Sequence, residues 1–186
     1  KAYPIWSGMS NAERSAIMVK LSEGIQARMD EFVKAESRDN GKPLTLAEHV
    51  DIPRAVSNFH FFATAIIHYA SESHNMEGVG VNYTLRKPIG IVGCISPWNL
   101  PLYLFSWKIA PALAAGNCVI AKPSEITPYT AYLLGKVAKE AGMPDGVLNI
   151  LHGEGQNAGD AIVKPPKIKA ISFTGGTATG EYIART

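Results

Sequence analysis

The sequence has little cysteine and no long apolar run. Only two of its 186 residues are cysteines, Cys94 and Cys118, and both lie in apolar, strand-like stretches. Such cysteines are typical of reduced core residues in an intracellular protein, so we expect a cytoplasmic location. No apolar run reaches membrane-spanning length, and the first residues, KAYPIWSGMS, lack the apolar core of a signal peptide. We therefore expect no membrane partner.

An excess of one charge is also missing. The formal net charge is +2, with 18% charged and 46% hydrophobic residues, which is an ordinary globular balance. The densest basic cluster, Lys164, Lys167 and Lys169, is interrupted by Pro165 and Pro166 and contains no aromatic residue. This composition does not favour a nucleic-acid surface, so we expect no nucleic-acid partner.

Several catalytic and metal-binding motifs are absent. There is no G-x-x-x-x-G-K loop and no G-x-S-x-G turn, and the five histidines form no H-E-x-x-H pattern, so we expect no metal site. Tyr132 and Lys136 do form the Y-x-x-x-K pair that short-chain dehydrogenases use. Because the glycine-rich fingerprint of those enzymes is missing upstream, an exposed face of an amphipathic helix is the favoured interpretation.

The chain begins with a helical part, which we assign to residues 1–79. Ser10 and Glu13 form a capping-box pattern, and apolar residues recur behind it at helical spacing: Ile17, Leu21, Ile25, Met29, Phe32 and Val33. The stretch RDNGKP should end this helix. A short second helix is expected from Leu44 to Val50, and Pro53 should begin a third.

Two extended segments follow the helical part. Residues 80–88, GVNYTLRKP, alternate in polarity and predict a half-exposed strand. We expect this segment to be an arm that pairs outside its own domain, because the next strand, IGIVGCIS, is almost wholly apolar and should be buried on both faces.

Strand and helix then alternate through residues 89–186. Strands are predicted at IGIVGCIS, CVIAK, VLNIL and IKAISFT, with helices at about 102–115 and 129–141, a short helix after Gly155 and a last helix after Gly176. This order predicts an α/β fold with a doubly wound parallel sheet. The last helix has no stop signal and the first residue is not Met, so we expect the chain to be part of a longer protein.

Unusual residue clusters follow each predicted strand at the same end of the sheet. They are Ser96–Asn99, Lys122–Glu125, His152–Gly155 and Phe173–Gly176. Doubly wound sheets bind their ligands at this end. This shared location is the strongest functional signal that the residues give without reference to other proteins.

The chemistry of these clusters suits a dinucleotide. Gly175 and Gly176 open a helix, where backbone N–H groups can receive a phosphate. Lys122 and Glu125 could bond ribose hydroxyls, and a Glu there disfavours a 2′-phosphate, although a solvated turn with Ser124 or Thr127 as helix cap is the alternative. The glycines at 153, 155 and 159 are spaced one residue wider than the usual fingerprint, so a plain loop remains equally open.

Three long stretches closely resemble the NAD-dependent aldehyde dehydrogenase superfamily: ISPWNLPLYLFSWKIAPALAAGNCVIAKPSEITP, GMPDGVLNILHGEGQNAGDAI and ISFTGGTATG. The resemblance covers nearly the whole chain. It implies a Rossmann-like domain that binds NAD, a small-molecule aldehyde as substrate, and an oligomerisation arm at 80–88 that builds homodimers or tetramers. DIPRAVSNFHFFA and ISPWNLPLYL look most like the branch that acts on an acidic semialdehyde of tryptophan breakdown by the kynurenine route.

The resemblance also implies roles for individual residues. Asn99 would donate its side-chain N–H to the substrate oxygen as that oxygen becomes negative, and the alternative is an Asn that caps the following helix. The residues implied at the cofactor are Ile95, Ser96, Pro97, Trp98, Asn99, Lys122, Ser124, Glu125, Gly155, Gly159, Phe173, Thr174, Gly175, Gly176 and Thr179. Gly176 stands where the family commonly has Ser.

A second set of residues is expected at the substrate. Tyr103, Leu104 and Trp107 would line the aldehyde tunnel, or else serve as ordinary core residues. Arg54 follows Pro53 at a predicted helix start, where the helix dipole disfavours a cation, so we expect Arg54 to bind a substrate carboxylate. The alternative is a surface Arg that is solvated or paired with Asp51.

The reaction implied by the resemblance needs groups that this sequence does not contain. The nucleophilic Cys and general-base Glu of the family lie beyond Thr186, and neither Cys94 nor Cys118 sits in the nucleophile motif. We therefore expect the catalytic domain to be absent and the fragment to be inactive alone. The alternative is a non-catalytic protein on the same scaffold, either crystallin-like or truncated.

Overall fold

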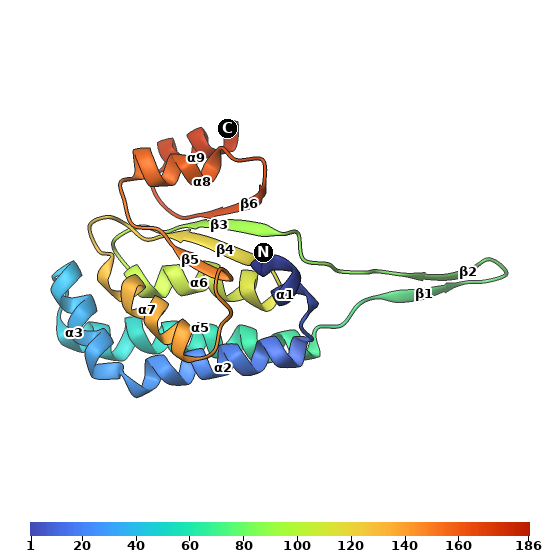
Figure 1. The fold of residues 1–186 in the computed structure, drawn as a ribbon, viewed down its shortest axis with the longest axis horizontal. Helices are drawn as coiled ribbons and strands as arrows, with labels where there is room; N and C mark the ends of the chain where they lie inside the picture. Colours follow the sequence, from blue (N-terminus) through green and yellow to red (C-terminus); the bar gives the residue numbers. More distant parts are fainter.

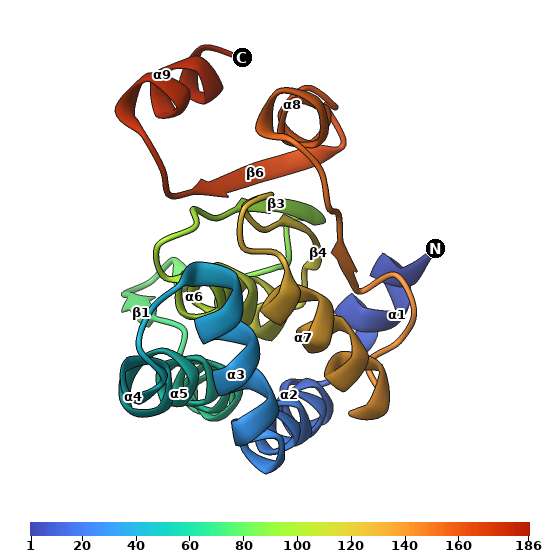
Figure 2. The ribbon, with the colours of Figure 1, turned by 90° about the vertical axis from the view of Figure 1, so that its left-hand side faces the viewer.

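The protein consists of a layered α/β body and a long projecting hairpin. A computed structural model describes all residues 1–186. A four-stranded parallel sheet has helices on both faces, and the hairpin extends far from this body (Figure 1, Figure 2). The parallel α/β architecture expected from the sequence is confirmed. None of the helices is both long enough and apolar enough to cross a membrane.

The helical part begins with α1 (Ala2–Gly8), α2 (Asn11–Ala27) and α3 (Met29–Asn40). The predicted capping box starts α2: the Ser10 hydroxyl accepts from the Glu13 amide at 3.2 Å, and the Glu13 carboxylate accepts from the Ser10 amide at 2.7 Å. The single helix expected up to Asn40 is divided at Arg28, whose ψ of 27° leaves the helical range. The break lets α3 pack across α7 (Tyr129–Glu140) while α2 lies along the next helix.

Pro53 lies in the first turn of α5 (Ile52–Ala65), as the sequence predicts, but it does not interrupt the helical run, which is continuous through it. This run passes through α4 (Leu44–Leu46), η1 (Ala47–Asp51), α5 and η2 (Ile66–His68) without a gap. Proline lacks an N–H and its ring clashes with the preceding helical turn. Here that turn, η1, is a wider π-helical turn, which accommodates the ring. The helix therefore begins at Leu44, and Pro53 lies inside it.

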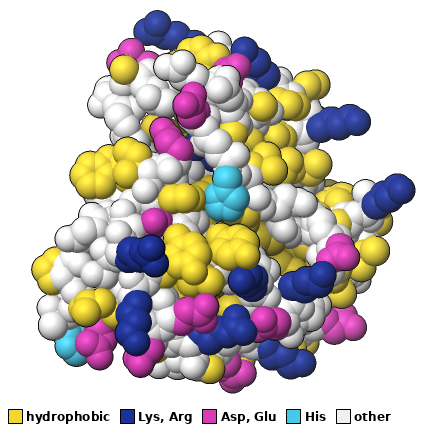
Figure 3. Space-filling view, turned by 60° about the vertical axis from the view of Figure 1, so that its left-hand side comes forward, with side chains coloured by type: hydrophobic (Ala, Val, Ile, Leu, Met, Phe, Trp, Pro, Cys, Tyr) yellow, Lys and Arg dark blue, Asp and Glu magenta, His cyan; other side chains and the backbone are white.

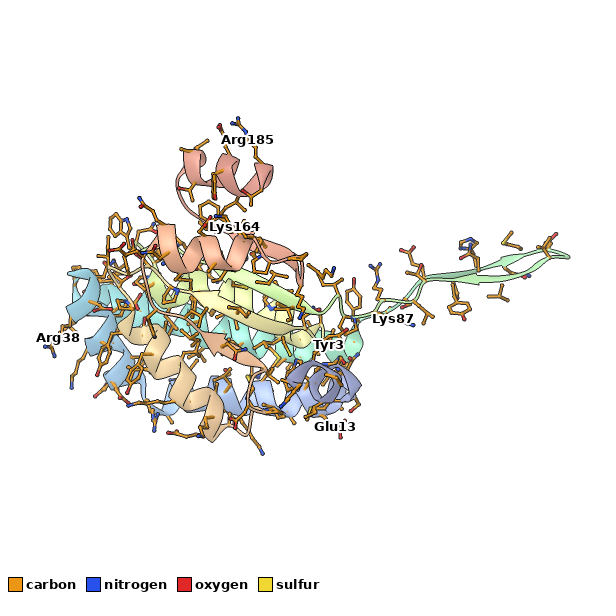
Figure 4. All side chains as sticks on the ribbon, turned by 45° about the horizontal axis from the view of Figure 1, so that its top comes forward. Tyr3, Glu13, Arg38, Lys87, Lys164 and Arg185 are labelled. Atoms are coloured by element: carbon orange, nitrogen blue, oxygen red, sulfur yellow. The ribbon has the colours of Figure 1, made fainter.

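The projecting hairpin consists of β1 (Ser73–Met76) and β2 (Gly80–Tyr83), which pair antiparallel with Ser73 opposite Tyr83. Residues 73–76 were expected in the helical part and form a strand instead. Every residue of both strands is exposed. Figure 4 shows Lys87 at the base of the hairpin, whose side chains project into open space.

The main sheet has the strand order β5-β4-β3-β6. Its strands are β3 (Ile91–Ile95), β4 (Cys118–Lys122), β5 (Leu148–Ile150) and β6 (Ile168–Phe173). The chain steps from β3 to β5 in one direction, through α6 (Pro101–Ala114) and α7. It then returns through η3 (Gly155–Gly159) and α8 (Asp160–Val163) to β6 on the other side of β3, and ends with α9 (Thr177–Arg185). Such a reversal of strand order opens a crevice at the carboxyl ends of the strands.

The hydrophobic core lies between the sheet and the helices on the α6 face. Phe32, Phe59 and Phe105 are fully buried there, and Cys94 and Cys118 belong to the same cluster. The two cysteines are free thiols, so their predicted place as reduced core residues is confirmed. On the opposite face α9 buries none of its residues, so its inner side lines open space beside the crevice.

Candidate functional site

The loops that follow β3, β4 and β6 begin side by side. Ile95 is in register with Lys122 on one side and with Phe173 on the other. Backbone bonds extend this alignment beyond the strands: the Ser96 amide donates to Lys122 O at 3.1 Å, and the Thr174 amide donates to Ile95 O at 3.1 Å. Figure 3 turns this edge of the molecule forward, where exposed hydrophobic side chains are interspersed with charged ones.

A pocket of about 580 Å³ opens at the point where the strand order reverses. It lies between η3 and α8 on one side and α9 on the other, with the end of β3 at its base. Four of its lining residues are among those that the sequence predicts for a cofactor: Ile95, Gly155, Gly159 and Thr179. The glycines leave room for a ligand, and Gly159 lies close to the Lys122 side chain.

Six further lining residues were missed by sequence reasoning: Gln156, Asp160, Val163, Ala178, Tyr182 and Ile183. Tyr182 Oη donates to Asp160 Oδ1 at 2.5 Å, which joins the two helical walls of the pocket. The pKa of Asp160 is lowered, first by its hydrogen bond with Lys164 and then by that with Tyr182. The helical spacing of positions 178, 179, 182 and 183 was a usable signal for this wall, because it puts them on one face of α9.

Lys122 is a buried cation whose three N–H groups all have acceptors. Its Nζ donates to Pro123 O at 2.6 Å, to Gly153 O at 3.0 Å and to Glu125 Oε2 at 3.1 Å. Glu125 itself remains exposed, and its pKa is lowered by its own backbone amide and by Lys122. The alternative of a solvated turn is therefore wrong for Lys122.

Ser124 and Thr127 are not helix caps either. The N-cap of α7 is Pro128, and the amide of the first helical residue, Tyr129, donates instead to Asp39 Oδ2 at 2.7 Å. The Ser124 hydroxyl instead accepts from the Ile126 amide at 3.3 Å and is almost completely buried. The Thr127 amide donates to Ser124 O at 3.3 Å, so both residues stabilise the loop after β4, which holds Lys122 and Glu125 at the edge of the sheet.

The turn between β6 and α9 is shaped by an aromatic ring. A Cβ atom at Gly175 would lie 2.4 Å from the Phe173 ring, whereas a Cβ at Gly176 would meet nothing within 4 Å. Gly176 is the N-cap of α9, and no side chain caps the free N–H groups of the first turn. A hollow of about 560 Å³ lies over this turn and includes Thr174. The geometry suits an anion at the start of α9.

The loop from Ser96 to Leu100 carries two polar side chains that make no hydrogen bond with the protein, and of these only Asn99 is exposed. The Ser96 hydroxyl is buried and has no hydrogen-bond partner. Asn99 is exposed, and its side-chain amide makes no hydrogen bond with the protein, although its backbone carbonyl accepts from Lys42 Nζ at 3.2 Å. The helix-cap alternative for Asn99 is wrong, because the N-cap of α6 is Leu100 and no side chain caps that helix. Pro97 and Trp98 complete the loop, with Trp98 exposed.

The residues predicted for a substrate gather on neighbouring faces of α5 and α6. The Arg54 guanidinium lies 5.8 Å from the Tyr103 ring centroid, and Tyr103 meets Trp107 edge-on at 6.0 Å. Leu104 is half-buried beside them. This places a cation beside two aromatic rings, which is a grouping that can receive an anionic, partly apolar ligand.

Two expectations about Arg54 are wrong. Arg54 does not pair with Asp51, because Asp51 is fully buried against Lys42 at 2.6 Å. Arg54 also does not lie at a helix start, since the helix begins at Leu44, so the dipole argument does not apply to it. The guanidinium is exposed and makes no ion pair within the chain.

Other candidate groups on the chain are ruled out by their surroundings. Burial raises the pKa of the Cys94 thiol to about 12, so this cysteine is not a ready nucleophile. Tyr132 is half-exposed on α7, and Lys136 Nζ lies 4.5 Å from its ring centroid. The Tyr132–Lys136 pair thus forms an exposed helix face, as the sequence predicted.

Comparison with known proteins gives consistent matches along the whole chain. Residues 1–186 match the model of the aldehyde dehydrogenase family. The chain is 53% identical to the 2-aminomuconic semialdehyde dehydrogenase of Danio rerio over 184 residues, which are 98% of this chain and 38% of that protein. It is 50% identical to the 2-hydroxymuconic semialdehyde dehydrogenase of Pseudomonas sp. (strain CF600) over 185 residues, which are 97% of this chain and 38% of that protein.

A solved structure shares the fold. The NAD+ complex of an aldehyde dehydrogenase from Bacillus cereus superposes with a TM-score of 0.94 at 40% identity, over 97% of this chain and 37% of that one. The chain thus spans little more than a third of the length of the proteins it matches.

Proposed function

The chain belongs to the aldehyde dehydrogenase family, and from this we propose that the whole protein oxidises an aldehyde to a carboxylic acid with NAD. Residues 89–186 form the cofactor-binding core of that enzyme. One observation carries the proposal: Asn99, Lys122 with Glu125, and the Gly175–Gly176 turn meet at the carboxyl end of one sheet, beside a pocket of about 580 Å³. These are the groups needed for a substrate oxygen, a ribose and a phosphate.

The residues at this edge fit a dinucleotide. The pocket between η3, α8 and α9 is lined by apolar side chains and glycines together with the polar Gln156, Asp160 and Thr179, which suits a flat ring system that carries polar groups. Glu125 is the exposed partner of Lys122, so it is the group that can turn to accept ribose hydroxyls, with Ser124 beneath it. The uncapped start of α9 at Gly176 would receive the pyrophosphate, bordered by Phe173 and Thr174. When bound, NAD supplies the acceptor for the hydride that leaves the aldehyde carbon.

Asn99 would act on the substrate oxygen. When a nucleophile adds to an aldehyde, the carbonyl oxygen becomes negative, and a fixed amide donor stabilises that charge more than it stabilises the starting carbonyl. The Asn99 amide is exposed and free of other partners, while its backbone is held by Lys42. Ile95, Ser96, Pro97 and Trp98 would lie along the cofactor in front of it.

The nucleophile would come from the part of the protein beyond this chain. A cysteine thiolate there would add to the aldehyde to give a thiohemiacetal, and a glutamate would act as base. Within the chain, Cys94 is excluded by burial and its raised pKa. No observation favours the non-catalytic alternative.

The proposed substrate is a semialdehyde that carries carboxylates, with 2-aminomuconic semialdehyde as the leading candidate. The relatives named for muconic semialdehydes support this class. Arg54 beside Tyr103 and Trp107 offers a guanidinium that could hold a carboxylate by two parallel hydrogen bonds. The hairpin of β1 and β2 would bind a neighbouring subunit, so that the enzyme works as a homodimer or tetramer.

Initial rates of the full-length protein with NAD and with NADP test the proposal. We expect oxidation of 2-aminomuconic semialdehyde with NAD and a clear preference for NAD over NADP, because the Glu125 carboxylate repels a 2′-phosphate. Glu125→Gln should narrow that preference, whereas Glu23→Gln, an exposed change on α2, should not. Equal rates with NADP, or no aldehyde oxidation, would contradict the proposal.

A further inference from the structure

Two successive carbonyls of the Asn99 loop accept hydrogen bonds from one turn at the end of α3, and the first of them, Trp98 O, also accepts from Thr127 Oγ1 at 3.4 Å. Asn40 Nδ2 donates to Trp98 O at 2.7 Å, and Lys42 Nζ donates to Asn99 O at 3.2 Å. Gly41 lies between them with φ +78°, a left-handed conformation that ends α3 and lets both neighbours reach the loop. Ser37 Oγ donates to Lys42 O at 2.7 Å and fixes the turn.

Lys42 is itself held by two buried carboxylates. Its Nζ lies 2.6 Å from Asp51 Oδ2 and 3.6 Å from Glu36 Oε1, and both acidic side chains are fully buried. Burying ionisable groups is costly, and apolar residues of similar size commonly give equal or better stability. Stability alone therefore does not explain why charges occupy this position directly beneath a functional loop.

The Glu36 carboxyl group lies in surroundings that disfavour its charged form. Neither Glu36 oxygen makes a hydrogen bond of normal geometry, although the Leu102 amide and the Thr130 hydroxyl face the carboxyl group. Burial raises the pKa of Glu36 to about 7, in spite of the nearby Lys42 ammonium. Asp51, at 2.6 Å, is thus the closer partner of Lys42, and Glu36, at 3.6 Å, is the weaker one.

We propose that the Asn40–Gly41–Lys42 turn, with Lys42 anchored by Asp51 and Glu36, positions Asn99 to stabilise the developing oxyanion. This inference rests on the proposed function and extends it to residues on α3 and η1. An oxyanion donor is effective only when its geometry is set before the reaction. Lys42 is a positioning residue, because its hydrogen bond goes to the Asn99 backbone carbonyl and leaves the side-chain amide free.

A double-mutant cycle in the full-length enzyme separates positioning from a general structural role. Lys42→Met should lower kcat by about 10- to 100-fold, with the Kd for NAD changed less than about twofold. In the Asn99→Ala background the same substitution should lower kcat by less than about twofold, because the donor that it positions is already gone. An equal loss of kcat in both backgrounds would overturn the proposal. Lys34→Met, an exposed change on α3, is the matched control and should leave kcat unchanged.

A second variant separates positioning from loss of folding. The combined change Glu36→Gln, Lys42→Met and Asp51→Asn removes all three buried charges and keeps the side-chain shapes. We expect the Tm of this triple variant to lie within a few degrees of the parent Tm, while its kcat stays as low as that of Lys42→Met. Recovery of kcat together with Tm would show that the charges serve only the fold and would overturn the proposal.

Crystal structures of the parent and of Lys42→Met keep this test independent of the proposed activity. If the full-length parent oxidises no aldehyde, the proposed function fails, yet the loop can still be compared. We expect residues 96–100 to shift, or to lose order, in Lys42→Met. A loop that superposes on the parent in the variant would overturn the positioning role.

Discussion

Asn99 and Lys122 lie at the same edge of the sheet, but only the Lys122 side chain is hydrogen-bonded to the protein. Lys122 is buried and gives all three of its N–H groups to protein oxygens, so it holds the loops after β4 and β5 together. Asn99 keeps its side-chain amide free while Lys42 holds its backbone. The two lysines thus fix the backbone of the loops, while the Asn99 side chain remains free to donate, and a preorganised site requires both.

Arg54 leads to a prediction about substrate choice. Its guanidinium is exposed beside Tyr103 and lacks an ion-pair partner, so an acidic substrate could pair with it. In the full-length enzyme, Arg54→Ala should lower kcat/KM for an acidic semialdehyde by about tenfold and leave a neutral aldehyde of similar length within about twofold, since a charge-assisted pair contributes about 1.5 kcal/mol.

The comparison of the two substrates provides the control for Arg54. Equal losses on both, or no loss on either, would remove Arg54 from the site. Arg38→Ala, an exposed change at the end of α3, should leave the ratio of the two rates unchanged.

Glu36 leads to a prediction about stability and pH. Its pKa is raised to about 7 in the folded protein because burial disfavours the carboxylate, whereas the pKa of a Glu in the unfolded chain is about 4.3. Between these values the folded state binds more protons, so the stability that Glu36 contributes at low pH is lost as pH rises through about 7. Glu36→Gln should therefore raise Tm relative to the parent by several degrees more at pH 8 than at pH 5.

Thermal unfolding of the full-length parent and variant at the two pH values measures this effect. Glu31→Gln, an exposed change on the same helix, should give the same small Tm difference at both. A Tm difference for Glu36→Gln that does not change with pH would contradict the account of its surroundings.

The turn between β6 and α9 contains two adjacent glycines, Gly175 and Gly176, that differ in the space around them and can be compared by substitution. A methyl group at Gly175 meets the Phe173 ring at 2.4 Å, so the ring must swing away, whereas one at Gly176 has open space around it. Gly175→Ala should therefore weaken NAD binding by the full-length protein at least fivefold more than Gly176→Ala does. Isothermal titration of both variants checks this, and similar Kd values for the two would show that the turn does not shape the cofactor site.

The main elements were largely predictable from local patterns, and the exceptions have physical reasons. The four parallel strands were predicted because each is a short apolar run followed by a turn. The continuous helix through Pro53 was not predicted, because a π-helical turn that admits the ring has no sequence signature. Strand β1 was missed because His74 and Asn75 give it no apolar alternation; its pairing with β2 is what makes it a strand.

The placement of the candidate site residues was predictable to the same degree as the strand ends that carry them. Lys122 is the last residue of β4, and Asn99 and Gly175 lie in the loops after β3 and β6, so the sheet brings them together once its order is known. Tyr182 and Asp160 were missed: helical spacing could have placed Tyr182 on one face of α9, but that this face meets α8 across the crevice has no signal in the sequence. Lys42 was missed as well, since the stretch around it also serves to end a helix.

For the whole molecule, the hairpin predicts assembly. A two-stranded hairpin is at best marginally stable alone, and this one exposes Val79, Val81 and Tyr83. Full-length protein should therefore be a dimer or tetramer at micromolar concentration. The pair Val81→Lys and Tyr83→Lys, which alters one face of β2, should shift it to smaller assemblies, while Asn82→Lys on the other face should not.

Light scattering after size-exclusion chromatography measures this assembly. A full-length parent that remains a monomer at micromolar concentration would contradict the role of the hairpin. Unchanged assembly in the Val81→Lys and Tyr83→Lys variant would place the contact elsewhere.

The turnover of the Asn99→Ala enzyme tests the central claim most directly. That claim is that the fold and the loop after β3 place the Asn99 side-chain amide where it stabilises the negative substrate oxygen. In the full-length protein with saturating NAD and aldehyde, kcat should fall by about a hundredfold or more, as for loss of one oxyanion donor. The Kd for NAD should change little, and Asn75→Ala on the exposed strand β1 should keep the parent kcat. A near-normal kcat for Asn99→Ala would contradict the account and leave Asn99 without a catalytic role.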